Sequence, residues 1–456
     1  MNPGVFWGYN FFTMEIKKRI YKPIQVIPLG FLAVILCGTI LLMLPVSTYS
    51  GSLSFFDAFF EAVSATCVTG LIVVDTATTF TFFGQLVLLV MIQLGGVGFM
   101  SVATFIFVTM GKKISLKERM TISESLGESH LQGVIQIALN VLKVTFSVEL
   151  CGALLLMTRF IPLFGFWKGL WMSIFTSISA FCNAGFDLMG NYTSLTAFVS
   201  DPIVNLAVCL LIIIGGLGFG VLTDLKTNKG KRKYRIQTKV VLYSTPVLIF
   251  VPSVIFLCLE YHRTMEGLPF FSKVMAAVFQ SVTCRTAGFN TIDQLGLSDA
   301  SKLLSVILMF IGGSSAGTAG GIKITTVAVI FFSTRSLLNG KDRAEVFERW
   351  ISKTTVIKAF SIFFIALSTL MGGLFLVSVL ENGHLGFINQ LYELTSAIAT
   401  VGLSVGLSGS ASIASRAVIC LMMFMGRVGI LTIPLAIGGK KEKPYIQYAE
   451  ADIMVG

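Results

Sequence analysis

Charged side chains are scarce in this sequence of 456 residues, since Asp, Glu, Lys and Arg together make up 12% of it. A soluble domain carries about one-quarter charged residues, so the composition excludes a soluble enzyme or binding module. Hydrophobic residues account for 54% of the chain, and the mean hydropathy is +0.84. We therefore expect an integral membrane protein.

Catalytic and metal-binding signatures are also lacking. The three histidines, His130, His262 and His384, fall in predicted loops or at the edges of apolar segments. An intramembrane hydrolase or metalloprotease needs a Ser–His pair, paired aspartates or metal ligands at membrane depth. The eight cysteines form no CxxC motif, which argues against a zinc site or a disulfide framework. We expect neither an enzyme nor a resident cofactor.

The chain has instead a series of long apolar segments. A helix rising about 1.5 Å per residue needs roughly 20 apolar residues to cross the hydrocarbon core. Segments of that length begin near Ile24, Phe83, Gly133, Pro202, Val240, Leu303, Ile357 and Ala417. Four shorter amphipathic runs lie between them, at Leu53–Thr66, Gly169–Phe181, Ser272–Cys284 and Phe387–Ala399. A run of about 13 residues cannot span, so each is expected to enter the membrane and turn back.

Basic residues cluster at the ends of every second predicted crossing, at Lys17–Lys22, Lys112–Arg119, Lys226–Lys239, Arg335–Lys358 and Lys440–Lys443. By the positive-inside bias, these ends and both termini face the cytoplasm. The net charge of +11 is therefore assigned to the inner surface of a bacterial plasma membrane and its lipids, and no nucleic-acid partner is expected. The longest basic run, KTNKGKRKYRIQTK, is a candidate docking site for a soluble partner.

A short motif follows each of the four amphipathic runs. Aligned on one glycine, it reads SATCVTGL at Ser64–Leu71, SAFCNAGF at Ser179–Phe186, VTCRTAGF at Val282–Phe289 and SAIATVGL at Ser396–Leu403. A pair of residues that includes glycine follows at a similar interval in each case, namely Gly95-Gly96, Gly215-Gly216, Gly312-Gly313 and Gly426-Arg427. Four copies of one unit are therefore expected, each with an outer helix, a short helix, a loop and an inner helix.

These four loops predict a cation filter. Non-helical backbone at membrane depth is tolerated only where it is buried in protein or lines a wet cavity. Four loops on one axis supply that cavity, and their carbonyl oxygens replace the water around a cation. Glycine suits them because a positive φ costs it little, and the short helices direct negative dipole ends to the same place. The predicted filter comprises Val68, Thr69, Gly70, Asn183, Ala184, Gly185, Thr286, Ala287, Gly288, Thr400, Val401 and Gly402. Among these, Asn183, Thr286 and Thr400 are expected to contribute carbonyls rather than side chains.

The four-unit pattern with TCVTGL, FCNAGF, TCRTAGFN and ATVGLS resembles the Trk/Ktr/HKT superfamily of potassium transporters, most closely the membrane subunit of a bacterial Ktr system. The resemblance covers nearly the whole chain beyond about Pro23. It implies potassium uptake, with potassium held at the filter by backbone carbonyls, and it leaves sodium dependence open. It also implies a homodimer on which a cytosolic ring of nucleotide-binding subunits docks. Leu403 and Ser404 depart from the TVGYG of potassium channels, which favours one ion site over four.

The segment Ile311–Lys323, IGGSSAGTAGGIK, places five glycines inside the third inner helix, too many for a stable helix. A flexible intramembrane loop is favoured over close packing by small residues, and the resembling family has a gate at this place. Arg427 shares the register of Gly96, Gly216 and Gly313, and its five donors suit the free carbonyls of such a loop. We expect it to hold the loop across the pore; the alternative is an arginine that only lines a wet vestibule. The predicted gate comprises Gly312, Gly313, Ser314, Ser315, Ala316, Gly317, Thr318, Ala319, Gly320, Gly321, Lys323 and Arg427.

Three other charged side chains lie near the filter glycines. A charge at membrane depth costs about 2.5–3.5 kcal/mol, so each is a functional candidate. Arg285 is expected to brace its loop by donating to backbone carbonyls. Glu61 and Glu393 each precede a filter glycine by nine residues, and they either brace the loops or attract ions at the pore mouth.

Together these features predict an all-α integral membrane protein with eight transmembrane helices and four short pore helices, arranged as four helix–pore-loop–helix repeats around a pseudo-fourfold pore. The expected segments are an N-terminal segment (1–23), repeats 1 to 4 (24–110, 111–225, 226–336 and 337–439) and a C-terminal tail (440–456). The tail is expected to contact the second copy or the cytosolic partner. The competing functions are a sodium-permeable cation channel and a cation/solute symporter; four units in one orientation argue against the inverted halves of a symporter.

Overall fold

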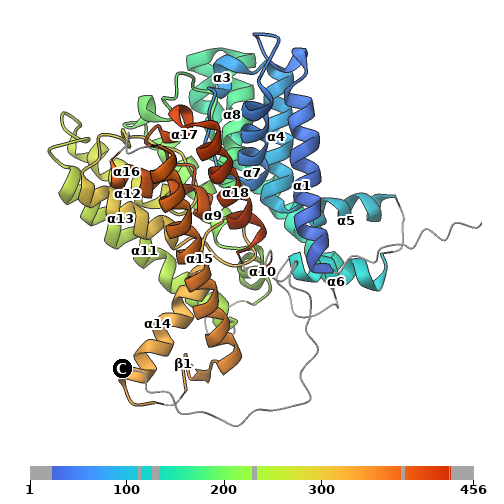
Figure 1. Ribbon diagram of the computed structural model, residues 1–456, viewed down its shortest axis with the longest axis vertical. Helices are drawn as coiled ribbons and strands as arrows, with labels where there is room; N and C mark the ends of the chain where they lie inside the picture. Colours follow the sequence, from blue (N-terminus) through green and yellow to red (C-terminus); the bar gives the residue numbers. More distant parts are fainter. Residues whose placement is uncertain are drawn as a thin grey trace, which may run out of the picture.

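The computed structural model describes residues 23–110, 114–125, 133–228, 234–341, 343–381, 386–430 and 432. The regular secondary structure of this part is almost all helix, as predicted, with one short hairpin of two strands (Figure 1). The N-terminal segment before Pro23 and the tail 440–456 lie outside the described residues. The repeat boundaries drawn from the sequence remain a prediction.

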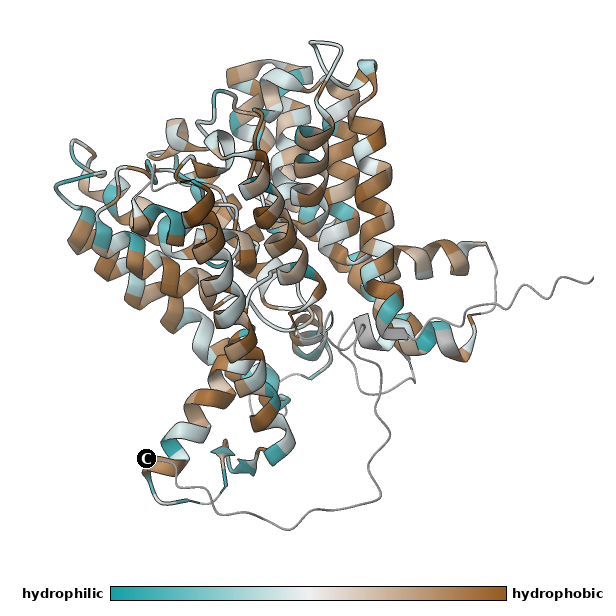
Figure 2. Cartoon of the chain, in the orientation of Figure 1, coloured by the Kyte–Doolittle hydropathy of each residue, from teal (hydrophilic) through white to brown (hydrophobic). Residues whose placement is uncertain are grey.

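The four predicted outer helices are α1 (Pro23–Leu42), α7 (Val134–Phe164), α11 (Ile236–Glu260) and α15 (Lys353–Leu380). Among the described residues, these are the helices long and apolar enough to cross a membrane alone. Large apolar side chains such as Ile40, Phe250 and Phe375 are exposed on them, and Figure 2 shows broad hydrophobic surfaces. Such a surface fits lipid rather than water.

The inner helices are α4 (Phe82–Val97), α9 (Pro202–Gly216), α13 (Asp299–Phe310) and α18 (Ile413–Val428). Each begins at a side chain that accepts a backbone N–H bond from the first turn, in order Thr81, Asp201, Ser298 and Ser412. The sequence predicted a break in the third inner helix, and the other three inner helices also end at a break. Gly98, Gly218 and Gly429 follow three of the inner helices with φ of 85°, 89° and 108°, a conformation that a helix cannot continue through.

The chain turns sharply after two of these breaks. Helix α5 (Phe99–Thr109) lies at 97° to α4, and α10 (Phe219–Thr227) lies at 91° to α9. In the third unit the segment Ile311–Lys323 is non-helical, as predicted, and α14 (Ile324–Leu338) follows it. If each bent pair counts as one crossing, the described helices supply six candidate spans. The predicted total of eight remains a prediction.

The four amphipathic runs form the short helices α2 (Phe55–Cys67), α8 (Phe166–Cys182), α12 (Phe270–Thr283) and α16 (Phe387–Ala399). Each packs against the outer helix of its own unit: α1 with α2, α7 with α8, α11 with α12 and α15 with α16. Each also packs against the inner helix of the preceding unit: α4 with α8, α9 with α12, α13 with α16 and α18 with α2. The last contact joins the fourth unit to the first, so the packing closes into a ring.

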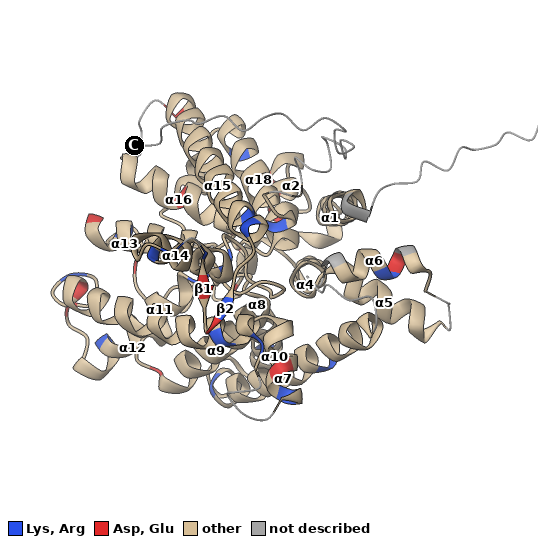
Figure 3. Ribbon diagram, turned by 90° about the horizontal axis from the view of Figure 1, so that it is seen from below, with Lys and Arg blue, Asp and Glu red and all other residues tan. Residues whose placement is uncertain are grey.

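The remaining elements are short and lie at the two ends of the ring. They are α3 (Thr76–Thr79), α6 (Leu116–Ser125), α17 (Leu407–Ser410), the 3-10 turns Pro45–Ser47 and Thr196–Phe198, and strands β1 (Glu345–Val346) and β2 (Arg349–Trp350). The strands pair antiparallel, with Glu345 opposite Trp350. Figure 1 places α3 and α17 at the upper end and the hairpin at the lower end, and Figure 3 shows charged residues on the hairpin from below.

Candidate functional site

The four loops after the short helices share one backbone conformation. The residue two before each glycine is left-handed, with φ of 56° at Val68, 60° at Asn183, 69° at Thr286 and 51° at Thr400. The glycines also have positive φ, from 70° at Gly185 to 95° at Gly402. The motif repeat found in the sequence is therefore a repeat of structure, and glycine is the residue that adopts this conformation at little cost.

These loops meet in a closed ring. A Cβ atom at Gly70 would collide with the carbonyl oxygen of Ala184, one at Gly185 with Ala287, one at Gly288 with Val401 and one at Gly402 with Thr69. Each glycine thus touches the residue that precedes the glycine of the next unit, and the fourth unit touches the first. The structure brings together one backbone carbonyl from each unit, and larger side chains do not fit between them.

Buried hydrogen bonds to serine side chains hold the first and fourth loops. The N–H of Gly70 donates to Ser64 Oγ at 3.1 Å, and the N–H of Gly402 donates to Ser396 Oγ at 3.0 Å. The second and third loops meet through side chains, because Asn183 Nδ2 donates to Thr286 Oγ1 at 3.5 Å. The predicted role of their carbonyls at the ion stays a prediction, while their side chains join the two loops.

Two buried carboxylates brace the chain that follows these loops. Glu61 Oε1 accepts the N–H groups of Val73 and Val74 at 2.8 and 3.2 Å. Glu393 accepts the N–H groups of Val405 and Ser408 at 2.7 and 3.0 Å, and the hydroxyls of Ser404 and Ser408. Both oxygens of Glu393 and one oxygen of Glu61 accept hydrogen bonds from these donors, so of the two roles kept open from the sequence these contacts support bracing.

Arg285 makes a different contact from the one predicted. Its Nη2 donates to Thr245 Oγ1 on α11 at 3.5 Å, and the side chain is buried. It therefore ties the third loop to an outer helix rather than to the carbonyls of its own loop.

A cavity of about 320 Å³ opens on one side of the glycine ring, and all four glycines line it. Asp75, Asp187 and Asp293 line it too, so its charge favours a cation. Burial raises the pKa of Asp187 to about 6, and nearby Asp75 adds to the shift. These aspartates were missed from the sequence, although Asp75 and Asp293 each follow a filter glycine by five residues. Extending the alignment of the four units past the glycine would have revealed Asp75 and Asp293.

The segment Ile311–Lys323 lies on the other side of the ring and is held by backbone groups of α9. Ser314 N–H donates to the Gly216 carbonyl at 3.0 Å, and Thr318 N–H donates to the Gly215 carbonyl at 3.3 Å. Thr318 Oγ1 donates to Phe181 O at the end of α8, at 3.1 Å. Gly320 packs directly against Thr400 of the fourth loop. All predicted gate residues thus lie together immediately behind the predicted filter.

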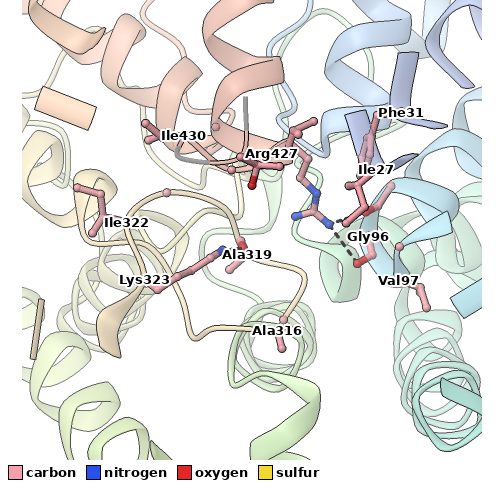
Figure 4. Close-up of a pocket in the computed structure, with 18 of the residues that line it drawn as sticks. Ile27, Phe31, Gly96, Val97, Ala316, Ala319, Ile322, Lys323, Arg427 and Ile430 are labelled. Carbon is pink, nitrogen blue, oxygen red and sulfur yellow. Dashed lines mark hydrogen bonds between the residues drawn. The ribbon is translucent and has the colours of Figure 1, made fainter. Parts of the chain in front are cut away.

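Arg427 connects this segment to the first unit. Its guanidinium donates to the Thr318 carbonyl and to the Gly95 and Gly96 carbonyls at the end of α4. Figure 4 shows the side chain reaching toward Gly96, while Lys323 points to Ala319, whose carbonyl accepts its Nζ at 2.7 Å. The contact that the sequence predicted between Arg427 and the loop is present. A cavity of about 450 Å³ surrounds these groups.

The first glycine of each pair has a packing role. A Cβ atom at Gly95 would collide with the Thr66 carbonyl, one at Gly215 with Phe181 and one at Gly426 with Ile398. Each of these carbonyls lies four residues before a filter glycine. The inner helices therefore approach the ends of the short helices so closely that only glycine fits. In the third unit, Gly312 packs instead against Gly320 of the loop.

Side-chain metal ligands are not grouped in this region. Over the described residues, no set of three or more His, Cys, Asp and Glu side chains is placed to hold a metal ion.

Comparisons with known proteins agree with this geometry. Residues 8–444 match TrkH, described as "Cation transport protein". The chain is 40% identical to "Ktr system potassium uptake protein B" of Bacillus subtilis, over 97% of this chain and 98% of that protein. It is 38% identical to "Potassium/sodium uptake protein NtpJ" of Enterococcus hirae, over 97% and 99% of the two chains. The crystal structure of the potassium transporter TrkH from Vibrio parahaemolyticus matches with a TM-score of 0.72 at 17% identity, over 92% of this chain and 86% of that one, and shows the same fold.

Proposed function

The chain belongs to the TrkH family of cation transport proteins, and on that premise we propose that it takes up potassium through the ring of four glycine loops. The observation that carries the proposal is the closed ring, in which each filter glycine touches the carbonyl preceding the next one. Backbone carbonyls replace the hydration shell of a potassium ion. The acidic cavity on one side of the ring supplies the ion, and the cavity beside Arg427 receives it.

Gating is assigned to the segment from Gly312 to Gly321 with Lys323 and Arg427. The segment lies directly behind the glycine ring and is held by two hydrogen bonds to α9 and by one each to α8, α10 and α18. Loss of Arg427 removes the bond at the Thr318 carbonyl, in the middle of the segment, and leaves the glycine–carbonyl contacts of the ring in place. We propose that the loop closes the pore while Arg427 holds it, and that it moves aside when a cytosolic partner changes state.

The same proposal covers location and assembly. The relative from Bacillus subtilis is named as one protein of a Ktr system, which supports a separate component for this chain also. We place the protein in a bacterial plasma membrane with both termini in the cytoplasm, as a homodimer that binds a ring of nucleotide-binding subunits. Deletion of Lys443–Gly456 should lower dimer recovery or co-purification of the partner. A dimer and a complex recovered in full would leave the tail without this role.

Ion flux into proteoliposomes tests the function. Purified full-length protein should carry rubidium, a potassium congener, down its gradient, and excess potassium should compete more strongly than excess sodium. Uptake of a sugar or amino acid in place of the ion would instead identify a solute symporter. Folded Arg427→Ala protein, in which the gate is released, that still carries none of these ions or solutes would contradict the proposal.

A sodium-permeable cation channel is the second candidate, and the name of the Enterococcus relative, "Potassium/sodium uptake protein NtpJ", favours it. Sodium flux without external potassium would support this candidate. Potassium flux that requires sodium, with no net sodium entry, would instead assign sodium the role of an activator.

A further inference from the structure

A groove of about 740 Å³ opens between α14 and α15, away from the glycine ring and the gate loop. Its lining includes Leu337, Lys341, Arg343, Trp350, Lys353 and Ile357. It shares no lining residue with the two cavities beside the ring. The groove therefore does not belong to the ion pathway proposed above.

One end of the groove is basic. The Arg343 guanidinium lies 4.1 Å from the ring centroid of Trp350, so the indole fixes its position. Lys353 is the first residue of α15, where backbone N–H groups and the helix dipole also favour an anion. Lys341 lies beside them and pairs with Glu345 at 2.6 Å, so its charge is partly compensated. Arg343 and Lys353 are the cations that carry recognition here.

The other end is apolar. Val356, Ile357 and Phe360 continue its lining along α15 beyond Lys353, and Ile357 is 65% exposed. Basic groups and apolar side chains therefore share one groove with the Trp350 ring. Figure 2 shows this change from hydrophilic hairpin to hydrophobic helix at the lower end of the chain. A free anion or a soluble acidic peptide would leave the aliphatic surface in water.

The length of α15 places the basic end at the surface of the membrane. Its 28 residues rise about 42 Å, whereas the hydrocarbon core is about 30 Å thick. The opposite end is fixed near the acidic cavity, because Glu381 accepts the N–H of the α18 cap Ser412 at 2.9 Å. The basic end thus emerges on the side where positive-inside orientation puts the cytoplasm and where anionic lipids gather.

We propose that this groove binds an anionic phospholipid of the cytoplasmic leaflet, with its phosphate at Arg343 and Lys353 and an acyl chain against Ile357 and Phe360. The inference uses the orientation given under the proposed function but not the transport activity. Since α14 continues directly from the gate loop, the lipid would hold the far end of the element that carries the gate.

Native mass spectrometry of the full-length protein tests the site, with phosphatidylglycerol and phosphatidylcholine of identical acyl chains as the probes. The parent should retain one phosphatidylglycerol per chain that resists exchange with phosphatidylcholine. The double variant Arg343→Gln/Lys353→Gln should bind phosphatidylglycerol about thirtyfold more weakly. Each basic side chain near the membrane surface contributes about 1 kcal/mol to the binding of an anionic lipid, and two such losses together correspond to that factor. The control Lys143→Gln removes an exposed charge of α7 outside the groove and should bind as the parent does.

Two further variants separate the two ends of the groove. Arg343→Lys should retain part of the affinity, and Ile357→Asp should lose it without change in the basic groups. All substituted side chains are exposed, so the variants should unfold at the parent's temperature. A double variant that retains phosphatidylglycerol like the parent would overturn the proposal.

Other occupants give distinct results. Equal retention of phosphatidylcholine, or displacement of phosphatidylglycerol by inorganic phosphate at similar concentration, would overturn recognition of an anionic lipid. Lipid binding that begins only after deletion of Lys443–Gly456, or only after dilution to a monomer, would assign the groove to the tail or to a second copy. Because the readout is bound mass, its failure is distinguishable from a failure of ion flux.

Discussion

Arg427 Nη2 lies 3.1 Å from the carbonyl oxygen of Gly96, although 331 residues separate the two in the sequence. Arg427 and Gly96 hold the same position in the fourth and first units. The same guanidinium also reaches the Thr318 carbonyl of the gate loop. One side chain therefore joins the first inner helix, the fourth inner helix and the loop, which requires the forked donors of arginine.

Arg427→Ala should raise ion flux in proteoliposomes that lack the cytosolic partner by roughly tenfold or more, because a hydrogen bond to a charged group is worth about 1.5–3 kcal/mol. Deletion of Ser314–Ala319 should raise it to a similar level, and the double variant should add little to either. Arg427→Lys should fall between parent and alanine, since one amine cannot reach both Thr318 and Gly96.

Arg416→Ala is the matched control for this series. Arg416 lies on the same helix, but it pairs with Asp57 at 2.9 Å and donates to the Gly409 carbonyl, away from the loop. Its loss should leave basal flux unchanged. If the effects of Arg427→Ala and of the deletion simply add, Arg427 and the loop do not act as one gate. The same conclusion follows if both variants conduct like the parent.

Gly70→Ser and Gly402→Ser should each weaken the preference for potassium over sodium. Both glycines have φ near +90°, and a side chain at either would displace a carbonyl of the neighbouring loop. The preference is measured as potassium uptake at varied sodium in cells that lack other potassium transport. Gly372→Ser is the control, because this glycine is exposed on α15 with open space around it. An unchanged ion preference in both filter variants would remove the filter assignment.

The repeat could be recognised in the sequence because the backbone conformation of each loop restricts which residues can occupy it. A left-handed residue followed by a glycine of positive φ recurs in all four units, and few residue types satisfy that geometry. The short helices were predictable for a similar reason, since their length forbids a full span. The closed order of the ring was not predictable, because contacts such as that of Gly402 with Thr69 join residues far apart in the chain.

The breaks in the inner helices were missed for a different reason. Gly98, Gly218 and Gly429 each follow the aligned pair by two residues, so the signal was present in GGVGF, GGLGF and GRVGI. Hydropathy alone hides it, because the residues around each glycine remain apolar. For Arg285 the sequence identified a charged residue at membrane depth but not its contact. Its partner Thr245 lies on another helix and could not be deduced from spacing along the chain.

Glu393→Gln should destabilise the protein more than Glu61→Gln. Both oxygens of Glu393 accept hydrogen bonds, so an amide would direct N–H groups at existing donors. Only one oxygen of Glu61 is used, and its Oε2 has no hydrogen-bond partner, so an amide nitrogen fits there. A buried unsatisfied group costs about 1–3 kcal/mol, and thermal unfolding in detergent should show the difference. Equal loss of stability in the two variants would contradict the bracing contacts.

Acidification of the outer solution should weaken potassium uptake through Asp187. Burial raises the pKa of this carboxyl group to about 6, so it is charged at pH 7.5 and takes up a proton as the pH falls through 6. The cavity above the glycine ring then loses one negative charge, and the potassium concentration for half-maximal flux should rise severalfold between pH 7.5 and 5.

Tyr192 in the same cavity does not titrate in this range, because burial raises its pKa from 10. Asp187→Asn should show the weaker affinity at pH 7.5 and a flattened pH profile, whereas Asp293→Asn removes a charge from the same cavity and should keep the slope near pH 6. Flux measured in proteoliposomes of fixed internal pH isolates the outer side, and an Asp187→Asn profile as steep as the parent's would assign the titration to another group.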